Sequence, residues 1–385
     1  MLHKYSLKGI AATAAVLAAT SLTSAVEARQ LNYAIGFPSG AIAVNAAERM
    51  ADTVENRTDG EVTVKVYPMS LLDMAETPGG VKQGLADAGF VLTQYNPSEF
   101  AHTNLVSEST MVLQLMGDEV EGRQAMAYAG AIAEFVLLNC PECNQEFADQ
   151  NQVYTGAGAG TSYGLVCNTP VTNGDELEGK RLRVGASQWA RWASAMDASP
   201  VSMTGNEMYE ALDQGVVDCV VVSAPEIHNF NMLDVVTDLT MAVPGGIFTS
   251  ATVNVNERVW DGLDENARRA LLRGSAEMAA MGAFRYHALE GEVMDKAREA
   301  GVAIHKPSDE LVKQTRRFIR NDLDTMAETY QQKYGVKRGE EMLADLREIL
   351  DKWVALVQDV DNADELAQLY WDEIHSRVDV SEHGL

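Results

Sequence analysis

The first hundred residues of the chain alternate between short apolar runs and segments with helical spacing. Residues 31–37 and 88–93 are apolar, and residues 61–67 alternate β-branched with polar positions. Each of these patterns predicts a strand. Apolar side chains recur at helical spacing in residues 41–56 and 77–85, between the strands. The β-α-β-α-β order predicts a mainly parallel sheet with right-handed crossovers.

A second set of strands and helices surrounds and follows a glycine-rich stretch at residues 156–164. Apolar and β-branched runs predict its strands, and helical spacing predicts its first helix. We expect strands at 153–154, 163–168, 181–184, 216–222 and 251–256, and a helix at 188–196. Long helical patterns then cover about 264–300 and 309–334, and two further acidic helices are expected within 337–376.

Composition and charge narrow the classes of function. The 385 residues are 46% hydrophobic and 22% charged, which is typical of a globular protein. This length allows two domains of roughly 150 residues each. Lys and Arg number 30 against 56 Asp and Glu, a formal charge of −26. Such acidity argues against nucleic acid or anionic lipid as a partner, since proteins bind both of them through clustered Lys and Arg side chains. In such an acidic protein, an anionic ligand would need positively charged side chains at its binding site.

The N-terminal residues 1–28 have the organisation of a secretory signal peptide. Lys4 and Lys8 supply a positive start, and residues 9–22 are apolar and rich in alanine. Small residues suit cleavage after Ala28, and residues 23–25 are a second candidate. The apolar stretch is shorter than the roughly 20 residues of a transmembrane helix, which disfavours a retained membrane anchor. We expect the mature chain to be exported to the periplasm and soluble.

Export makes disulfides expected among the four cysteines, Cys140, Cys143, Cys167 and Cys219. Four cysteines allow three full pairings, which sequence alone does not separate. We favour Cys167 with Cys219 because each lies in a run that predicts a core strand. Cys140 and Cys143 are then left as a close pair that could bridge locally. Their C-x-x-C spacing lacks the βαβ context of a redox motif, and it lacks the second ligand pair of a zinc site.

Candidate catalytic chemistry is sparse. Residues 160–164 match the G-x-S-x-G pattern, but a strand and not a helix is expected after Ser162, so the context of a hydrolase nucleophile is wrong. The same stretch lacks G-x-G-x-x-G, which disfavours a dinucleotide site. No H-E-x-x-H occurs, and we expect His228 to have a surface or structural role. For an exported α/β chain this favours binding over catalysis, with no cofactor and no metal.

The segment from residue 176 to 219 carries a longer pattern. Residues 176–184 read ELEGKRLRV, residues 197–203 read DASPVSM, and residues 206–219 read NEMYEALDQGVVDC. This arrangement resembles the solute-binding proteins of tripartite ATP-independent periplasmic (TRAP) transporters, the dicarboxylate-binding family. Weaker matches at 66–72, 84–90 and 259–263 extend the resemblance over about residues 30–335.

The resemblance implies a two-lobed flytrap of class α/β, with strands crossing between the lobes, a long helix spanning them and a ligand in the cleft. We expect lobe I at residues 29–155 and 243–288, and lobe II at residues 156–242 and 289–336. A C-terminal helical extension is expected at 337–385, beyond the usual length of the family. Closure on the ligand would be a hinge motion. The closed form would dock on the membrane permease subunits of a TRAP transporter.

Arg183 lies at the position of the family's selectivity arginine. In a strand Arg181 and Arg183 share a face, while Leu182 and Val184 take the other. A guanidinium is planar, always charged and able to bind a carboxylate through two parallel hydrogen bonds. The resemblance therefore implies that Arg183 holds a carboxylate, and we expect Arg181 to be solvated.

Ligands of open α/β sheets bind beyond the carboxyl ends of the strands, which places the rest of the expected pocket. The candidates are Phe37, Tyr95, Tyr163, Trp189, Val222, Ser223 and Phe248. Trp189 fits an ordinary core position equally well. Many family members read G-Q-E-N-P after V-V-D, whereas Cys219 to Val222 stand here, with Ser223 as a substitute polar contact. With so many aromatic candidates, the sequence favours an aromatic or keto monocarboxylate over a sugar acid.

Three alternatives from other classes remain. An exported hydrolase using Ser162 would place a general base within hydrogen-bond reach of that hydroxyl. A binding protein of an ATP-driven importer would have a hinge without the TRAP pattern. A ligand sensor would contact a receptor in place of a permease.

Overall fold

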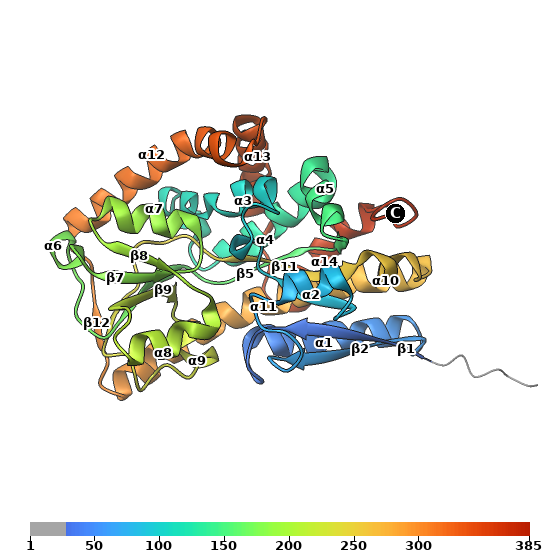
Figure 1. Cartoon of the computed structure of the whole chain (residues 1–385), viewed down its shortest axis with the longest axis horizontal. Helices are drawn as coiled ribbons and strands as arrows, with labels where there is room; N and C mark the ends of the chain where they lie inside the picture. The colour runs from blue at the N-terminus through green and yellow to red at the C-terminus, as the bar shows by residue number, and fades with distance from the viewer. Residues whose placement is uncertain (1–27) are drawn as a thin grey trace, which may run out of the picture.

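The computed structural model describes residues 28–385 and shows two α/β sheets side by side, joined by a long helix (Figure 1). The two-part α/β architecture expected from the sequence is confirmed. Apart from Ala28, the expected signal peptide lies outside the described residues. Among the described helices, none is long and apolar enough to cross a membrane.

The first sheet contains six strands in the order β2-β1-β3-β11-β4, with β5 also paired to β11. Strands β1, β2 and β3 are mutually parallel, as predicted for this part of the chain. The prediction of a mainly parallel sheet is wrong for the sheet as a whole, because β11 returns from the second half of the molecule and runs antiparallel to β3, β4 and β5. The bounds are β1 Arg29–Ile35, β2 Val62–Pro68, β3 Ala88–Val91, β4 Gln152–Tyr154, β5 Ala157–Ala159 and β11 Thr249–Asn256.

The second sheet also contains six strands, in the order β12-β10-β6-β9-β7-β8. Strand β7, which carries Arg183, runs parallel to both of its neighbours, while β6 runs antiparallel to β9 and β10. Strands β8, β10 and β12 are short edge or near-edge strands that the sequence patterns did not predict. The bounds are β6 Tyr163–Cys167, β7 Arg181–Val184, β8 Ser199–Ser202, β9 Cys219–Ser223, β10 Asp238–Thr240 and β12 Ala303–His305.

Helices cover the faces of both sheets and bridge them. Residues 101–149, for which no element was predicted, contain three α-helices and several short turns. The α-helices are α1 Ile42–Arg57, α2 Thr77–Gln83, α3 Ala101–Ser107, α4 Gln124–Glu134, α5 Pro141–Asp149, α6 Gly174–Leu177, α7 Ser187–Ala195, α8 Met208–Asp213, α9 Pro225–Asn229, α10 Glu257–Asp261, α11 Glu265–Glu299, α12 Asp309–Tyr334, α13 Gly339–Leu356 and α14 Ala363–Glu373. The shorter helical segments are η1 Thr93–Tyr95, η2 Ser109–Leu115, η3 Asp118–Val120, η4 Phe135–Asn139, η5 Gly205–Glu207 and η6 His375–Arg377.

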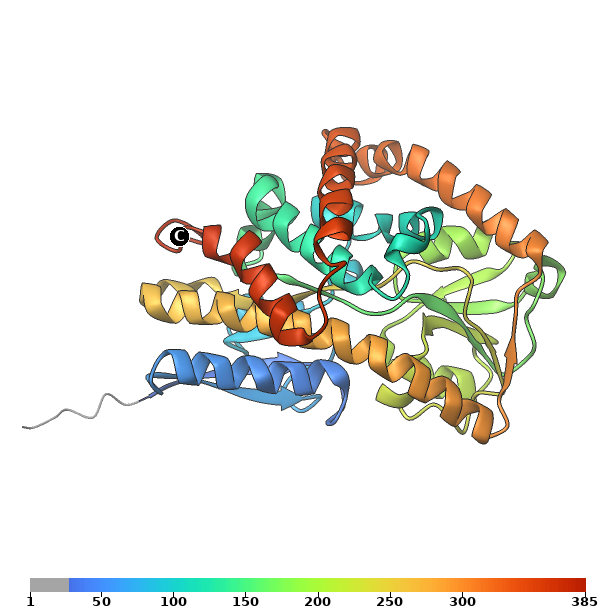
Figure 2. The same ribbon diagram turned by 180° about the vertical axis from the view of Figure 1, so that it is seen from behind.

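Helix α11 is the long helix that runs across both halves of the molecule (Figure 2). It begins where the Asp264 carboxylate accepts a hydrogen bond from the Ala267 N–H at 2.8 Å, a normal N-cap. Its 35 residues give a length of about 52 Å at 1.5 Å per residue. The N-terminal half, up to Ala283, packs into the core around the first sheet. The C-terminal half, from Tyr286, packs into the core around the second sheet.

Helices α13 and α14 form the C-terminal extension and pack against α4 and α11 of the first half of the molecule, on the side that faces the viewer in Figure 2. Trp353 of α13 is fully buried in the core of that half, where its indole N–H donates a hydrogen bond to Glu134 of α4 at 2.7 Å. Lys352 pairs with the same carboxylate at 2.9 Å. The extension is therefore part of the packed structure of this half.

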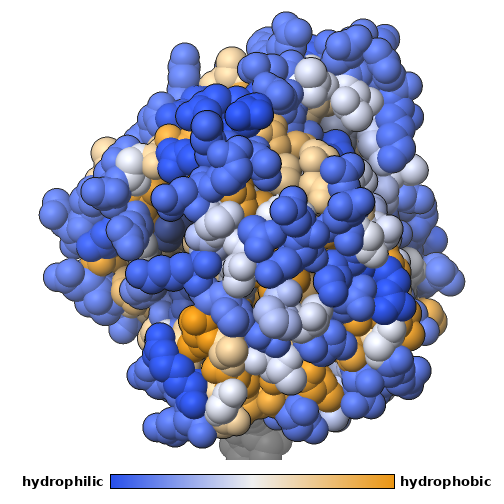
Figure 3. Space-filling model, turned by 90° about the vertical axis from the view of Figure 1, so that its left-hand side faces the viewer, coloured by the Kyte–Doolittle hydropathy of each residue, from blue (hydrophilic) through white to orange (hydrophobic). Residues whose placement is uncertain are grey.

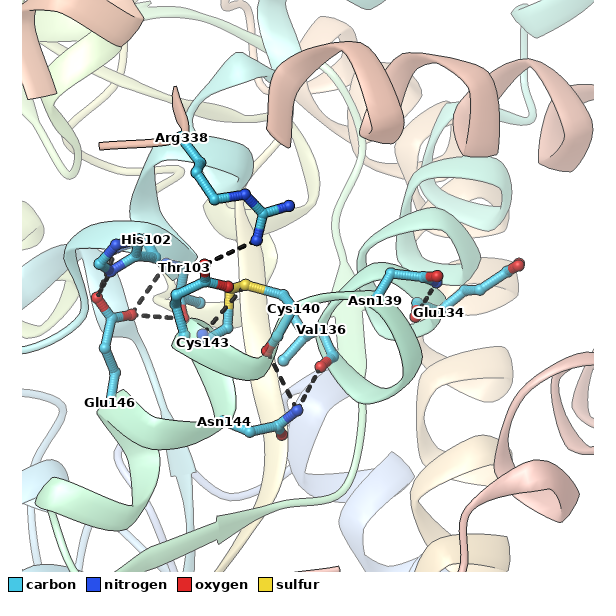
Figure 4. The surroundings of a disulfide bond; sticks show 11 residues. His102, Thr103, Glu134, Val136, Asn139, Cys140, Cys143, Asn144, Glu146 and Arg338 are labelled. Carbon is cyan, nitrogen blue, oxygen red and sulfur yellow. Dashed lines mark hydrogen bonds and ion pairs between the residues drawn. A yellow bond between two sulfur atoms is a disulfide. The ribbon is translucent and has the colours of Figure 1, made fainter. Parts of the chain in front are cut away.

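Both cysteine pairs form disulfides. Cys167 and Cys219 face each other directly in the β6–β9 ladder, which confirms the favoured pairing. The second bridge joins Cys140 and Cys143 at the start of α5 (Figure 4). Both sulfurs of this second bridge belong to buried residues, and the Cys143 N–H donates to Cys140 Sγ at 3.1 Å.

The surface at the α6 and β12 end of the molecule is mainly hydrophilic, with small groups of hydrophobic side chains between the polar ones (Figure 3). This agrees with the strongly acidic composition of the chain. Burial of apolar side chains is concentrated in the two cores described above.

Candidate functional site

A mostly apolar cleft lies between the two sheets, with an empty volume of about 750 Å³. Both sheets, helices α1, α8, α9 and α11 and the segments that cross between the sheets contribute to its walls. The lining comprises Phe37, Ala43, Ala46, Met74, Phe90, Leu92, Tyr95, Gly158, Ala159, Gly160, Tyr163, Arg183, Gly205, Met208, Val222, Glu226, Phe230, Phe248, Ser250, Thr252, Met278, Ala279, Gly282 and Tyr286. A mostly apolar lining with a few polar and charged groups is the character of a small-molecule site.

Arg183 lies in β7 with its guanidinium at the cleft and only 2% of the residue exposed. Its Nε and Nη2 donate to the Met203 carbonyl at 3.0 and 2.9 Å, and Nη2 also donates to the Tyr95 hydroxyl at 3.2 Å. Within residues 28–385 these are its hydrogen bonds, and no carboxylate forms an ion pair with it. The N–H groups of Nη1 thus remain available. A buried cation that forms no direct ion pair is costly, and a ligand carboxylate would supply the missing partner.

Arg181, two positions earlier in the same strand, has a different environment. It is exposed and forms an ion pair with Asp218 at 2.9 Å, consistent with the expected solvated role. Leu182 between the two arginines is fully buried on the other face of the sheet. The strand therefore presents one arginine to solvent at its start and one to the cleft at its end.

Two tyrosine hydroxyls lie near the Arg183 guanidinium. The Tyr95 hydroxyl accepts from both Arg183 Nη2 and the Gly205 N–H, at 3.2 and 3.0 Å, so its own proton is free to be donated. Tyr163 stacks on Trp189 with ring centroids 4.2 Å apart. Burial and the negative charge of Glu226 raise the pKa of the Tyr163 hydroxyl, which keeps it a proton donor at neutral pH.

Glu226 is the acidic group of the cleft. It follows β9 at the start of α9 and is 6% exposed. Its carboxylate accepts from Tyr286 of α11 at 2.8 Å and from Asn229 at 2.9 Å. Burial raises the pKa of the Glu226 carboxyl, and these hydrogen bonds and the charge of Arg183 partly oppose the shift. A cationic and an acidic side chain therefore line one apolar space.

Aromatic and thioether side chains form the remaining walls. The Phe37 ring lies 5.6 Å from Phe90 and 5.7 Å from Phe230, measured between centroids. A second group of rings includes Phe248, whose centroid lies 6.1 Å from those of both Tyr95 and Tyr163. These rings can accommodate the apolar body of a ligand while the charged groups bind its polar ends.

Six of the eight candidates from the sequence line this cleft: Arg183, Tyr163, Phe248, Tyr95, Phe37 and Val222. The other two, Trp189 and Ser223, are fully buried and do not belong to the lining. Trp189 packs behind Tyr163 and donates its indole N–H to the Gly245 carbonyl at 2.9 Å. The Ser223 hydroxyl has no hydrogen-bond partner among the described residues. Whether any of the eight contacts a ligand stays a prediction.

Sequence reasoning missed Glu226, the hydrogen-bonded Tyr286 and the methionines of the lining. A signal for Glu226 does exist, since it is an ionisable residue placed three positions after a strand of five buried residues. Tyr286 and Met278 carried no such signal, because they belong to a helix whose neighbours were unknown. His228, for which a surface or structural role was expected, is exposed.

The geometry around Ser162 does not favour a hydrolase. Its hydroxyl accepts one hydrogen bond, from Gln114 at 3.1 Å, and within residues 28–385 no histidine or carboxylate bonds to it. Strand β6 follows directly, as expected, so the strand–turn–helix of a nucleophile elbow is not formed. In the described part of the chain, no group of three or more His, Cys, Asp or Glu residues is arranged to hold a metal.

Residues 140–330 match the family model DctP, described as bacterial extracellular solute-binding protein, family 7. The chain belongs to the TRAP solute-binding protein family. It is 22% identical to the sialic acid-binding periplasmic protein SiaP of Vibrio cholerae over 330 residues, which covers 81% of this chain and 94% of that protein.

Two solved structures of solute receptors share the fold of this TRAP protein. DctP7 of Bordetella pertussis, an extracytoplasmic solute receptor binding pyroglutamic acid, superposes with a TM-score of 0.69 at 22% identity, covering 83% of this chain and 100% of that one. A TRAP solute-binding protein of Bordetella bronchiseptica with bound mandelate superposes with a TM-score of 0.69 at 21% identity, covering 84% and 99%. The two-lobed fold expected from the resemblance is thereby confirmed.

Proposed function

We propose that this TRAP protein captures an organic acid in the cleft between its sheets and delivers it to the permease subunits of its transporter. The observation that carries the proposal is the buried Arg183 guanidinium, which faces the cleft without a carboxylate partner among the described residues. Arg183 then binds the carboxylate of the ligand.

The hydrogen bonds around Arg183 support this role. The Met203 carbonyl and Tyr95 hold one edge of the guanidinium, so the planar group is fixed in orientation before a ligand arrives. The free N–H groups of Nη1, together with the Tyr95 hydroxyl, supply adjacent donors for a carboxylate. Because the site is largely shielded from water, each of these bonds is stronger than it would be at the surface.

The walls of the cleft favour a ligand with an apolar or aromatic body and one carboxylate. Arg183 is the one cation among the described lining residues, and the rings of Phe37, Phe90, Phe230 and Phe248 supply apolar contact area. The bound pyroglutamate and mandelate of the two structural relatives are also small monocarboxylates. An aromatic or keto monocarboxylate fits this environment better than a sugar acid, whose hydroxyl groups would face apolar walls.

The lobe division supports capture by closure. We propose lobe I as residues 29–159 and 243–288 and lobe II as residues 160–242 and 289–336. The first crossing is placed after Ala159, in place of residue 155, because β5 pairs with β11 of the first sheet. Cleft residues come from both lobes and from the crossing segments, so closing the hinge would bring the two walls onto the ligand.

The place of action follows from the family. TRAP solute-binding proteins work in the periplasm, and the signal-like residues 1–28 would direct export and then be removed. The closed, loaded form would dock on the permease. Its release of ligand there requires no chemical change in the ligand, so no catalytic step is assigned to the chain.

The test is a thermal-shift screen of the mature protein against organic acids, after refolding from denaturant to remove co-purified ligand. A ligand that binds the folded state alone raises the melting temperature by mass action. We expect monocarboxylates to raise it in the wild type and to fail in Arg183→Ala. Arg181→Ala, from the exposed end of the same strand, is the matched control and should respond like the wild type. A shift that persists in Arg183→Ala would contradict the assignment.

A further inference from the structure

The cleft contains a second charged group whose purpose a simple monocarboxylate leaves unexplained. Glu226 lines the same space as Arg183, and the two are the charged residues among the described lining. They form no ion pair with each other. Arg183 donates to Met203 and Tyr95, and Glu226 accepts from Tyr286 and Asn229. A ligand with two opposite charges would therefore give each of these groups an ion-pair partner.

The balance of charge in the closed cleft distinguishes classes of ligand. With Arg183 and Glu226 both ionised, the empty cleft is neutral. A simple monocarboxylate would leave it with one uncompensated negative charge in an apolar space, which is unfavourable. A ligand that carries one carboxylate and one cationic nitrogen would keep it neutral and pair both buried groups.

We propose that the cleft takes a zwitterionic monocarboxylate, with its carboxylate on Arg183 and its cationic nitrogen on Glu226. This inference rests on the proposed function and specifies the ligand class of the same site. The ligand is thus an amino acid or a similar molecule in which an apolar body links the two charged groups.

The local geometry of Glu226 suits a cation. Each carboxylate oxygen receives one hydrogen bond, from Tyr286 to Oε1 and from Asn229 to Oε2, so each keeps a lone pair for a further donor. The donors come from α11 and from α9 itself, which fixes the carboxylate against both elements. The raised pKa of the ligand-free carboxyl would fall when a cation binds beside it.

The aromatic walls add to the same preference. Phe37, Phe230 and Tyr163 belong to the lining together with Glu226. Aromatic faces attract a cationic nitrogen through their quadrupole, an interaction that strengthens where water is excluded. A hydroxyl group in the same place would gain neither this attraction nor the pairing of charges.

The experiment uses two matched pairs of probes and isothermal titration calorimetry on the refolded mature protein at pH 7.5. Proline and pyroglutamate share a five-membered ring and a carboxylate, but only proline carries a cationic nitrogen. Phenylglycine and mandelate differ by an ammonium in place of a hydroxyl. We expect the amine of at least one pair to bind tenfold or more tightly than its partner, and Glu226→Gln to remove that preference.

Glu226→Gln keeps the size and the acceptor oxygen of the side chain, and Glu290→Gln is the matched control. Glu290 also has a pKa raised by burial, but it does not line the cleft, so its variant should keep the wild-type preference. Circular dichroism and the urea midpoint verify that both variants fold. The comparison of probes on the wild type requires no variant, so a folding defect leaves it intact.

The outcomes separate this inference from the proposed function. Binding of pyroglutamate or mandelate, lost in Arg183→Ala, without tighter binding of the matched amine would overturn the zwitterion and leave the proposed function standing. An amine preference that survives Glu226→Gln would also overturn the inference. If none of the four probes binds the refolded wild type, the inference fails for both ligand skeletons, while the wider acid screen still decides the proposed function.

Discussion

The contact between Gly130 and Trp353 offers a sharp test of how the C-terminal extension packs. Gly130 lies inside α4, and a Cβ atom added there would come within 2.5 Å of the Trp353 ring atoms Cδ2 and Cε3. Ordinary carbon contacts are about 3.5–4.0 Å, so the ring would have to move by an ångström or more. Trp353 is fully buried, and its N–H is bonded to Glu134, so the ring has little freedom to move.

Gly130→Ala therefore combines two opposing effects. Alanine is about 1 kcal/mol more favourable than glycine inside a helix. Overpacking a dense core costs about 1–3 kcal/mol, and this contact is close enough for the upper end of that range. We expect a net loss of about 2 kcal/mol in the free energy of unfolding. Gly291→Ala in α11 is the matched control, because no atom of residues 28–385 outside its own helix backbone and its two chain neighbours lies within 4 Å of its added Cβ, and it should gain up to about 1 kcal/mol.

Urea denaturation followed by circular dichroism measures both changes, read from the midpoint at constant slope. A double-mutant cycle with Trp353→Ala identifies the source of the strain. On that background Gly130→Ala should become stabilising, because the ring it strikes is gone. If Gly130→Ala stabilises the wild type as much as Gly291→Ala does, the described packing of α13 on α4 is refuted.

Three further predictions concern other parts of the molecule. Burial lowers the pKa of His375 from 6.5 to about 4, so the unfolded chain takes up a proton that the native state does not, and stability falls as pH falls through this window. The loss from this group is about 3 kcal/mol, and His375→Gln should show a correspondingly shallower decline in urea midpoint between pH 7 and pH 4. Loss of the Cys167–Cys219 disulfide, which closes a separation of 52 residues, should cost about 4 kcal/mol by loop entropy, measured by denaturing the double alanine variant beside the oxidised wild type. Asp322→Asn removes the carboxylate that binds Arg191 at 2.6 Å and links α7 to α12; a drop of about 2 kcal/mol in unfolding free energy is expected for the loss of a hydrogen-bonded charge, and no change would contradict the role of this pair.

The regular elements of the fold were largely predictable from periodicity. The long helices expected at 264–300 and 309–334 are observed at Glu265–Glu299 and Asp309–Tyr334, because their apolar spacing and caps are local signals. The direction of β11 and the existence of β8, β10 and β12 were not predictable from periodicity. These three strands have three or four residues each, and their pairing depends on partners far away in sequence.

The residues of the candidate site were likewise only partly predictable from the sequence. Arg183 was found through a long sequence pattern. Tyr95, Tyr163 and Phe248 were found because ligands of open α/β sheets bind beyond the carboxyl ends of the strands. The same reasoning selected Ser223, and Trp189 was selected because it begins the helix after Arg183. Both lie behind the lining, since the end of a strand or the start of a helix specifies a neighbourhood and not the direction of each side chain. Glu226 was missed because its importance comes from lining the same cleft as Arg183. Only the folded structure shows that the two side chains line one cleft.

Trp189 gives the cleft an optical reporter that is separate from its binding surface. Its ring stacks on Tyr163 at 4.2 Å and on Phe248 at 5.8 Å, and both of those rings line the cleft. Indole emission responds to the polarity and motion of its surroundings, so a ligand that settles against either ring alters the fluorescence of a tryptophan it does not touch. The occupied and empty forms of the protein should thus be distinguishable by light alone, without a label on the chain or on the ligand.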